Sequence, residues 1–155
     1  MSSIALAIAT GLGVGYVRFA PGTFGSLLGL VVWAAMPSSL SLQVLVIAVV
    51  FVAGAWSASV AERRLRATDP GPVVIDEVLG MLMTLFLNPV GWFGAFAGFF
   101  LFRFFDVVKP YPANRLEKLH GGVGVMADDA MAAIYANLAL KAGLFLTSGL
   151  IPAAS

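Results

Sequence analysis

Five acidic residues of this 155-residue chain stand beside apolar segments, where a negative charge is costly. They are the pairs Asp76–Glu77 and Asp128–Asp129 and the single Asp106. Helix capping accounts for any one of them, because carboxylates are stabilised at helix N-termini. Capping is a weaker explanation for five acids that reach the same side of a bundle, since they repel one another and need a cation. Oxygen ligands, with no cysteine and one histidine in the chain, indicate Mg²⁺ or Mn²⁺ rather than zinc.

Two Gly-rich segments could bring backbone N–H groups to an anion. Segment 21–26 precedes an apolar run, so its N–H groups and the hydroxyls of Thr23 and Ser26 could receive a phosphate at a helix N-terminus. An ordinary N-cap formed by Thr23 or Ser26 is the alternative. Segment 121–124 is either a flexible turn or a place where the backbone approaches a ligand.

Positively charged side chains accompany the acids in the last third of the chain. Arg103 and Lys109 add positive charge, and the planar guanidinium of Arg103 could bind a phosphate through two hydrogen bonds. The alternative role for Arg103 is an ion pair with Asp106, three residues away on the same helix face. His120, the only histidine, is expected to be a surface or loop residue rather than a catalyst.

The composition indicates what kind of molecule must position these residues. Hydrophobic residues make up 60% of the chain and charged residues only 11%, with a mean hydropathy of +0.96. A soluble domain of this size could not cover so much apolar surface, and a disordered chain would be far more polar. The net charge of +1 argues against nucleic acid as a partner, and the absence of cysteine excludes thiolate chemistry. We therefore expect residues 1–155 to form a single membrane-embedded domain.

Several apolar segments have the character of membrane helices, which need about 20 residues to cross a ~30 Å hydrocarbon layer. In chain order they are 4–17, 27–36, 42–61, 78–102 and 130–150. Pro89 and Gly91 predict a turn that splits the fourth segment into a hairpin of two short helices. The first segment contains three glycines and could be a span, a half-helix or a re-entrant segment. The sequence thus predicts an all-α integral membrane protein, a compact bundle of four to five short helices with site loops on the cytoplasmic side.

The charged residues are grouped in a way that predicts the topology. Seven of the seventeen lie in 62–77 and eight lie in 103–129. The two helices of the predicted hairpin separate these groups, so both fall on one face of the membrane. Positive charge is retained in the cytoplasm, so this face is the cytoplasmic one. The uncharged turns 37–39 and 89–91 would face the opposite side.

Four segments form a recognisable series: 20–27, 69–71 together with 74–81, 102–112 and 121–129. In order and spacing they resemble the four signature blocks of the phosphatidylglycerophosphatase A family. The resemblance covers roughly residues 11–137, and the four blocks together are highly specific. One departure is Ala133, where the family pattern leads us to expect a glycine; this position concerns helix packing more than chemistry.

The resemblance implies a Mg²⁺-dependent phosphatase of the bacterial inner membrane. Together with the apolar segments and the charge pattern, this predicts a multi-pass protein whose active site faces the cytoplasm. Its substrate would be an anionic phospholipid, phosphatidylglycerophosphate, which it would convert to phosphatidylglycerol and inorganic phosphate. For this activity we expect catalytic roles for Asp76, Asp128 and Asp129 and metal binding by Glu77, Asp106, Asp128 and Asp129. We expect the phosphate to be held by Thr23, Gly25, Ser26, Arg103 and Lys109.

Two alternatives stay open at this point. The attacking group is either a metal-activated water or an aspartate. A non-enzymatic cation channel or transporter with an acidic site is the rival function, disfavoured because the acids sit at one face rather than along a span.

The depth of the site follows from the length of the hairpin. Its arms, 77–87 and 92–102, would each be about 16–17 Å long, well short of the hydrocarbon layer. We therefore expect the five carboxylates to converge in a cytoplasm-facing pocket at the depth of a lipid phosphate, open sideways to the inner leaflet.

Overall fold

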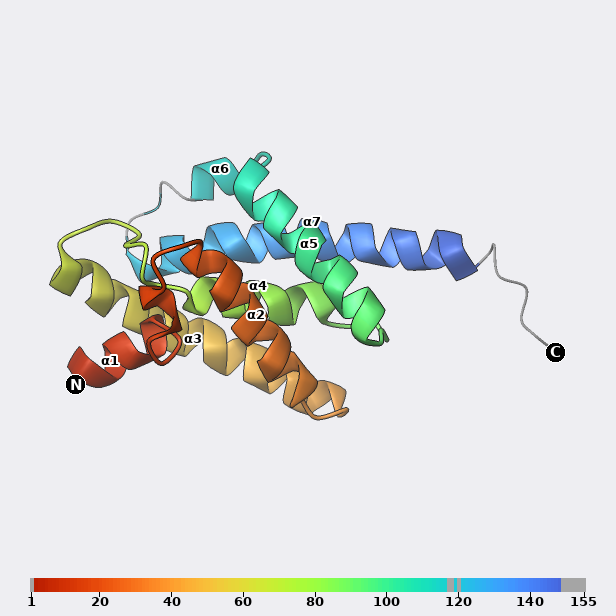
Figure 1. Cartoon of the computed structure of the whole chain (residues 1–155), viewed down its shortest axis with the longest axis horizontal. Helices are drawn as coiled ribbons and strands as arrows, with labels where there is room; N and C mark the ends of the chain where they lie inside the picture. Colours follow the sequence, from red (N-terminus) through yellow and green to blue (C-terminus); the bar gives the residue numbers. More distant parts are fainter. Residues whose placement is uncertain (1, 117–118, 120, 149–155) are drawn as a thin grey trace.

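The computed structural model describes residues 2–116, 119 and 121–148 (Figure 1). In chain order the elements are α1 (Ser2–Ala9), the 3₁₀ helix η1 (Val14–Tyr16), α2 (Pro21–Ala34), α3 (Leu40–Leu65), α4 (Ile75–Leu85), α5 (Trp92–Val108), α6 (Ala113–Leu116) and α7 (Gly122–Ser148). The described residues contain no strand, which confirms the predicted all-α class.

Two of these helices, α3 and α7, are long and apolar enough to cross a membrane. They have 26 and 27 residues, so each is about 40 Å long. Only 22% of the most apolar stretch of each helix is buried inside the molecule. A core helix of a soluble protein would be mostly covered, whereas α3 exposes Leu42, Leu45, Val49 and Val52 along its length.

The predicted hairpin is present, with arms of unequal length. α4 has 11 residues and α5 has 17, and they are joined by the turn 86–91. The second arm therefore continues six residues beyond the predicted end at Phe102. It ends at Val108, and the next residue, Lys109, adopts a left-handed conformation (φ 44°) and precedes Pro110.

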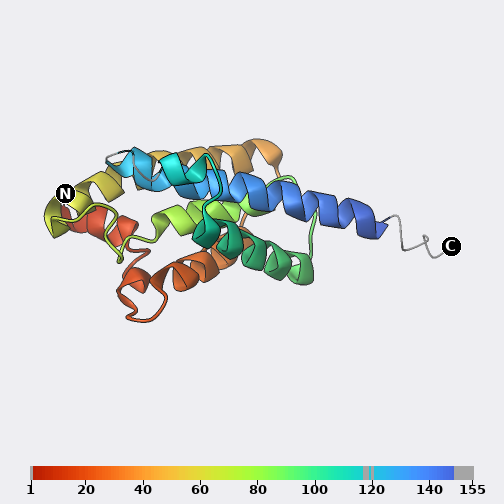
Figure 2. The same cartoon turned by 90° about the horizontal axis from the view of Figure 1, so that it is seen from above.

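α4 is the central helix of the bundle. The two views place it among α2, α3, α5 and α7 (Figures 1 and 2), and eight of its eleven residues are buried. Gly80 lies so close to the ring of Phe102 that a Cβ atom there would overlap it. Small residues of α7 complete the core against α4, among them Ala133, which is fully buried. The position where a glycine was expected thus serves helix packing.

Residues 2–17 form a short α-helix and a 3₁₀ turn, not one helix of spanning length. α1 has 8 residues, about 12 Å, and packs against α3. Left-handed conformations at Gly11, Leu12 and Gly13 then reverse the chain. The N–H of Val74, just before α4, donates to the carbonyl of Ala9 at 2.8 Å, so α1 also supports the start of the central helix.

The bundle has two different ends (Figure 1). The turns 35–39 and 86–91 lie at one end with the last part of α7, and both border a cavity of about 700 Å³. α1, the loop 66–74, α6 and the start of α7 lie toward the other end. The two uncharged turns are therefore neighbours in space.

Candidate functional site

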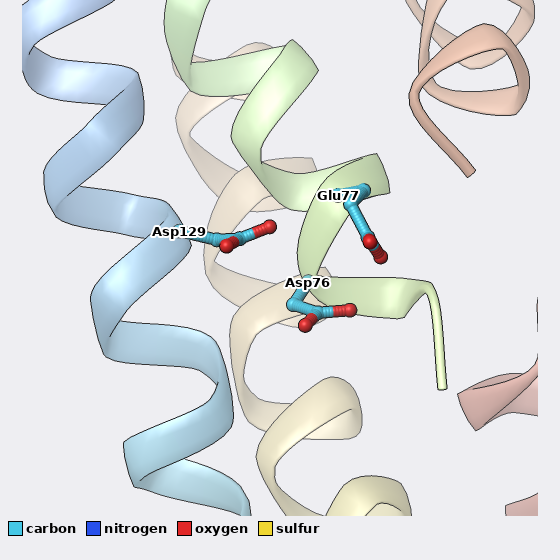
Figure 3. A group of neighbouring side chains, drawn as sticks. All are labelled: Asp76, Glu77 and Asp129. Atoms are coloured by element: carbon cyan, nitrogen blue, oxygen red, sulfur yellow. The ribbon is translucent and has the colours of Figure 1, made fainter. Parts of the chain in front are cut away.

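Three carboxylates from two helices meet near the start of α4. Asp76 and Glu77 lie in the first turn of α4, and Asp129 lies on α7. Each offers one oxygen atom, and these three atoms all lie within 4.8 Å of one another. Figure 3 shows Asp129 extending from α7 toward the two acids of α4. We call these three residues the acidic triad.

The acidic triad is buried and incompletely paired. Asp76 and Asp129 are 6% and 4% exposed, and the Glu77 side chain is 13% exposed. Oδ1 of Asp76, Oε2 of Glu77 and Oδ2 of Asp129 have no hydrogen-bond partner among the described residues. Leaving buried carboxylate oxygens without a donor is costly, so this arrangement calls for a cation.

The pKa values of the two acids on α4 also indicate that negative charge is unfavourable at this place. Burial raises the pKa of Asp76 well above its usual range, and the neighbouring Glu77 charge adds to this effect. Burial also raises the pKa of Glu77 to about 8, with a further contribution from the charge of Asp129. Both shifts mean that the folded protein disfavours negative charge at these two side chains.

Arg103 and Asp106 of α5 flank the acidic triad. Nη1 of Arg103 lies 2.6 Å from Oδ2 of Asp106 and 3.9 Å from Oε1 of Glu77. The carboxyl group of Asp106 in turn interacts with that of Asp129. Of the two roles open to Arg103, the structure contains the ion pair with Asp106, and this pair touches the acidic triad.

Lys109 and Asp128 form a second pair beside it. Nζ of Lys109 lies 2.6 Å from Oδ2 of Asp128, which is 5% exposed. The structure therefore places Asp128 with a lysine rather than in the acidic triad. All five predicted acids lie in one region. This region also contains Arg103 and Lys109, the two cations predicted to bind phosphate, so acids outnumber cations there.

The Gly-rich segment 21–26 differs from the expected turn, because α2 already begins at Pro21. Oγ of the fully buried Ser26 donates to the carbonyl of Gly22 at 2.8 Å, so its proton stays within the helix. Thr23 is partly buried in the first turn, where its N–H donates to the carbonyl of Ala20 at 2.9 Å.

The glycines of this segment let α2 approach the site closely. A Cβ atom at Gly22 would overlap the Glu77 carboxylate and the Arg103 guanidinium. A Cβ atom at Gly25 would lie 2.7 Å from Cβ of Val74, the residue that precedes α4. The first turn of α2 therefore lies directly against Glu77 and Arg103.

The start of α7 also differs from the prediction made from the sequence. The apolar segment 130–150 predicts a last helix that Asp128 and Asp129 open, but the helix begins at Gly122, so the two acids are its seventh and eighth residues. A Cβ atom at Gly122 would overlap the carbonyl of Ala55, and the Gly122 N–H donates to Oγ of Ser59 at 2.8 Å. The backbone thus approaches α3 here rather than a ligand. His120 lies outside the described residues.

Comparisons with known proteins give a consistent result. The model of a family described as phosphatidylglycerophosphatase A matches residues 7–144. A protein of Bacteroides thetaiotaomicron, named provisionally as a phosphatidylinositol-3-phosphatase, is 39% identical over 144 residues, which cover 86% of this chain and 89% of the relative.

Two further relatives are named phosphatidylglycerophosphatase A. The protein of Haemophilus influenzae is 38% identical over 133 residues, covering 83% of this chain and 82% of its own. The protein of Escherichia coli is 34% identical over 130 residues, covering 82% of this chain and 76% of its own. No solved structure matches the chain.

Proposed function

The chain belongs to the phosphatidylglycerophosphatase A family, and from this premise we propose that it converts phosphatidylglycerophosphate to phosphatidylglycerol and inorganic phosphate. As a member of this family it is a phosphatase that acts on a phosphomonoester. The family match carries the proposal, because residues 7–144 include every residue of the site described above. The buried carboxylates and the two cations beside them are groups that phosphoryl transfer requires.

The acidic triad fits a divalent cation that prefers oxygen ligands. Its three oxygens are close together, buried, and in part without a hydrogen-bond donor among the described residues. Mg²⁺ is the expected ion, held by Asp76, Glu77 and Asp129, with Asp106 beside Asp129. When bound, it would neutralise the phosphoryl oxygens and lower the pKa of a water molecule.

The side chains around the acidic triad have separate tasks in this proposal. The guanidinium of Arg103 lies against the first turn of α2, so the two together can hold the phosphate. Lys109 brings a second positive charge next to Asp128. An aspartate either accepts the proton of the attacking water or attacks phosphorus itself. In both routes the P–O bond to the lipid breaks, and the lipid oxygen takes up a proton and leaves as the hydroxyl group of phosphatidylglycerol. In the second route water then cleaves the phospho-aspartate, which restores the carboxylate and releases inorganic phosphate.

We further propose that α3 and α7 cross the bacterial inner membrane with the site toward the cytoplasm. Support comes from the exposed apolar surface of both helices and from Arg63, Arg64 and Arg66 at the end of α3. In this orientation the acidic triad lies at the end of the bundle that faces the inner leaflet's phosphates. The lipid substrate would then stay in the membrane during hydrolysis.

A second substrate is favoured by one specific observation. The Bacteroides thetaiotaomicron relative is named for a phosphate on an inositol lipid, whereas the other two are named for a phosphate on a glycerol lipid. Both substrates are phosphomonoesters on anionic lipids. Phosphatidylinositol 3-phosphate is therefore the alternative substrate for this chain.

The experiment measures phosphate release by the purified, detergent-solubilised chain. We expect turnover of phosphatidylglycerophosphate, loss of activity in EDTA and recovery with added Mg²⁺. Phosphatidylinositol 3-phosphate is the competing substrate, and the Asp129→Asn variant is the inactive control. Release from the inositol lipid alone would replace the proposed substrate. No release from either lipid, together with cation flux in proteoliposomes, would favour the channel or transporter.

A further inference from the structure

One side chain of α7 contacts the last carbonyl groups of α4. Nδ2 of Asn137 lies 3.1 Å from the carbonyl oxygen of Met83, 2.9 Å from that of Thr84 and 2.7 Å from that of Phe86. Two hydrogens are thus shared among three acceptors. Asn137 is the only amide side chain in segment 130–150, whose one charged residue is Lys141.

These contacts supply hydrogen-bond donors to the carbonyl groups at the C-terminal end of α4. The last carbonyls of any α-helix have no partner within the helix. At the end of α4, Thr84 is fully buried and Leu85 is 2% exposed, so water is kept from these carbonyl groups. The N–H groups of Phe86 and Asn88 donate to the carbonyls of Met83 at 3.3 Å and Leu85 at 3.2 Å, and Nδ2 of Asn88 donates to that of Thr84 at 3.2 Å. Asn137 adds a second donor at Met83 and Thr84 and the donor at Phe86, the residue that follows α4.

The same two helices carry the acidic triad nearer their N-terminal ends. α4 and α7 run in the same direction (Figure 1), and Asp76 on α4 faces Asp129 on α7. Thr84 follows Asp76 by eight residues, and Asn137 follows Asp129 by eight residues. Each interval is about 12 Å of helix, so the hydrogen bonds lie two turns beyond the acidic triad in both helices.

We propose that Asn137 is a positioning residue for the acidic triad. By holding the C-terminal carbonyls of α4, it fixes the position of α4 along α7 and hence the distance between Asp129 and the Asp76–Glu77 pair. A sliding displacement of one helix would separate the oxygens that must share one ion, whereas the helices themselves would stay packed. This inference rests on the proposed function, because it assumes that the acidic triad binds a divalent cation.

The test measures binding of Mn²⁺ to the full-length protein in nanodiscs by electron paramagnetic resonance, which needs no turnover. Asn137→Leu removes the donor at similar size and should weaken Mn²⁺ binding by about tenfold or more, as for other residues that support a metal ligand. Asn137→Gln keeps the amide and should restore binding. The extra methylene has room, because Asn137 borders a cavity of about 550 Å³.

A matched control separates positioning from general stability. Leu140 lies one turn further along α7, is 5% exposed and packs in the same core without a side-chain hydrogen bond. Leu140→Ala should lower the unfolding temperature and leave Mn²⁺ binding unchanged. If Asn137→Leu does not fold, Asn137→Ser, with a hydroxyl too short to reach three carbonyls, should show an intermediate loss of affinity.

Three results would overturn the inference. Wild-type Mn²⁺ affinity in Asn137→Leu, or in Asn137→Ser if it is the variant that folds, would show that the hydrogen bonds do not set the geometry of the acidic triad. An equal loss of affinity in Asn137→Leu and Leu140→Ala would show a general effect of destabilisation. Absence of Mn²⁺ binding in the wild-type protein would overturn the proposed metal site itself and this inference with it.

Discussion

At the scale of single residues, the structure sorts five similar acids into different environments. Asp76, Glu77 and Asp129 share the acidic triad, whereas Asp106 and Asp128 each face a cation within 2.6 Å. A carboxylate that pairs with an arginine or lysine already has its charge balanced. A buried carboxylate with unpartnered oxygens gains more stabilisation from a metal ion. The two neighbours Asp128 and Asp129 should therefore respond differently to the same substitution.

Asp129→Asn should abolish both turnover and metal binding. It removes one of three closely spaced oxygens, so we expect Mn²⁺ affinity and activity to fall by at least about 100-fold, beyond the loss for a supporting residue. In EDTA its unfolding temperature should match or exceed that of the wild type, because a neutral amide replaces a buried acid that must either take up a proton or repel its neighbours. Mn²⁺ titration and thermal unfolding check both effects.

Asp128→Asn is the matched comparison on the adjacent residue. We expect loss of turnover with Mn²⁺ binding largely retained, because the substitution removes the carboxylate that Lys109 contacts and leaves the acidic triad complete. Folding of both variants is confirmed by circular dichroism. Near-normal activity in both variants would contradict a role for the Asp pair in the reaction.

Arg103→Lys keeps the positive charge and loses the planar fork. The guanidinium reaches Asp106 with Nη1 and lies against the first turn of α2, an arrangement that one ammonium group cannot reproduce. We expect kcat/KM to fall by about tenfold, which corresponds to about 1.4 kcal/mol of transition-state stabilisation. Unchanged kinetics would mean that Arg103 only pairs with Asp106 or supplies a diffuse charge.

At the scale of elements, close approach of helices builds the site. α2 lies against Glu77 and Arg103 because Gly22 has no side chain, and α7 starts against α3 because Gly122 has none. α4 can reach four other helices because its neighbours present small residues such as Ala132 and Ala133. The glycines that suggest a phosphate-binding turn in the sequence thus also serve as contact surfaces.

Gly22→Ala should lower activity although alanine is the better helix former by about 1 kcal/mol. The added Cβ would overlap the Glu77 carboxylate and the Arg103 guanidinium, so α2 must move away from the site. Gly71→Ala is the control, because nothing lies within 4 Å of its Cβ and activity should persist. Equal activity in the two variants would show that the approach of α2 is dispensable.

At the scale of the whole molecule, the two ends of the bundle have different chemistry. One end carries the uncharged turns, and the other carries the acidic triad, α1 and the loop 66–74. The apolar surface of α3 and α7 between them has the length of a bilayer. Because the two ends differ, the orientation of the chain in a membrane can be tested by measuring which end reacts with a reagent added from outside.

Single cysteines can report this orientation, because the chain has none of its own. In intact spheroplasts a membrane-impermeant maleimide should label Ser38→Cys in the first turn and should not label Ala67→Cys in the loop 66–74. Both positions are exposed in the structure, so both should react after lysis. The reverse pattern would place the acidic triad on the outer side of the membrane.

The sequence by itself determined the features that depend on local pattern and composition. The all-α class, the two long apolar helices and the break near Pro89 follow from hydropathy and from proline's missing N–H, which act within a few turns of chain. The family also follows from short motifs in a fixed order. The number of membrane spans and the Mg²⁺ dependence stay predictions.

Only the tertiary structure decided which acids share a site and which are paired. Asp128 and Asp129 are adjacent in sequence, yet on a helix they point about 100° apart, so one meets Lys109 of α5 and the other meets α4. The role of Asn137 depends on how far α4 extends along α7. Such relations depend on how distant segments pack in space, and no local pattern of residues specifies that distance or direction.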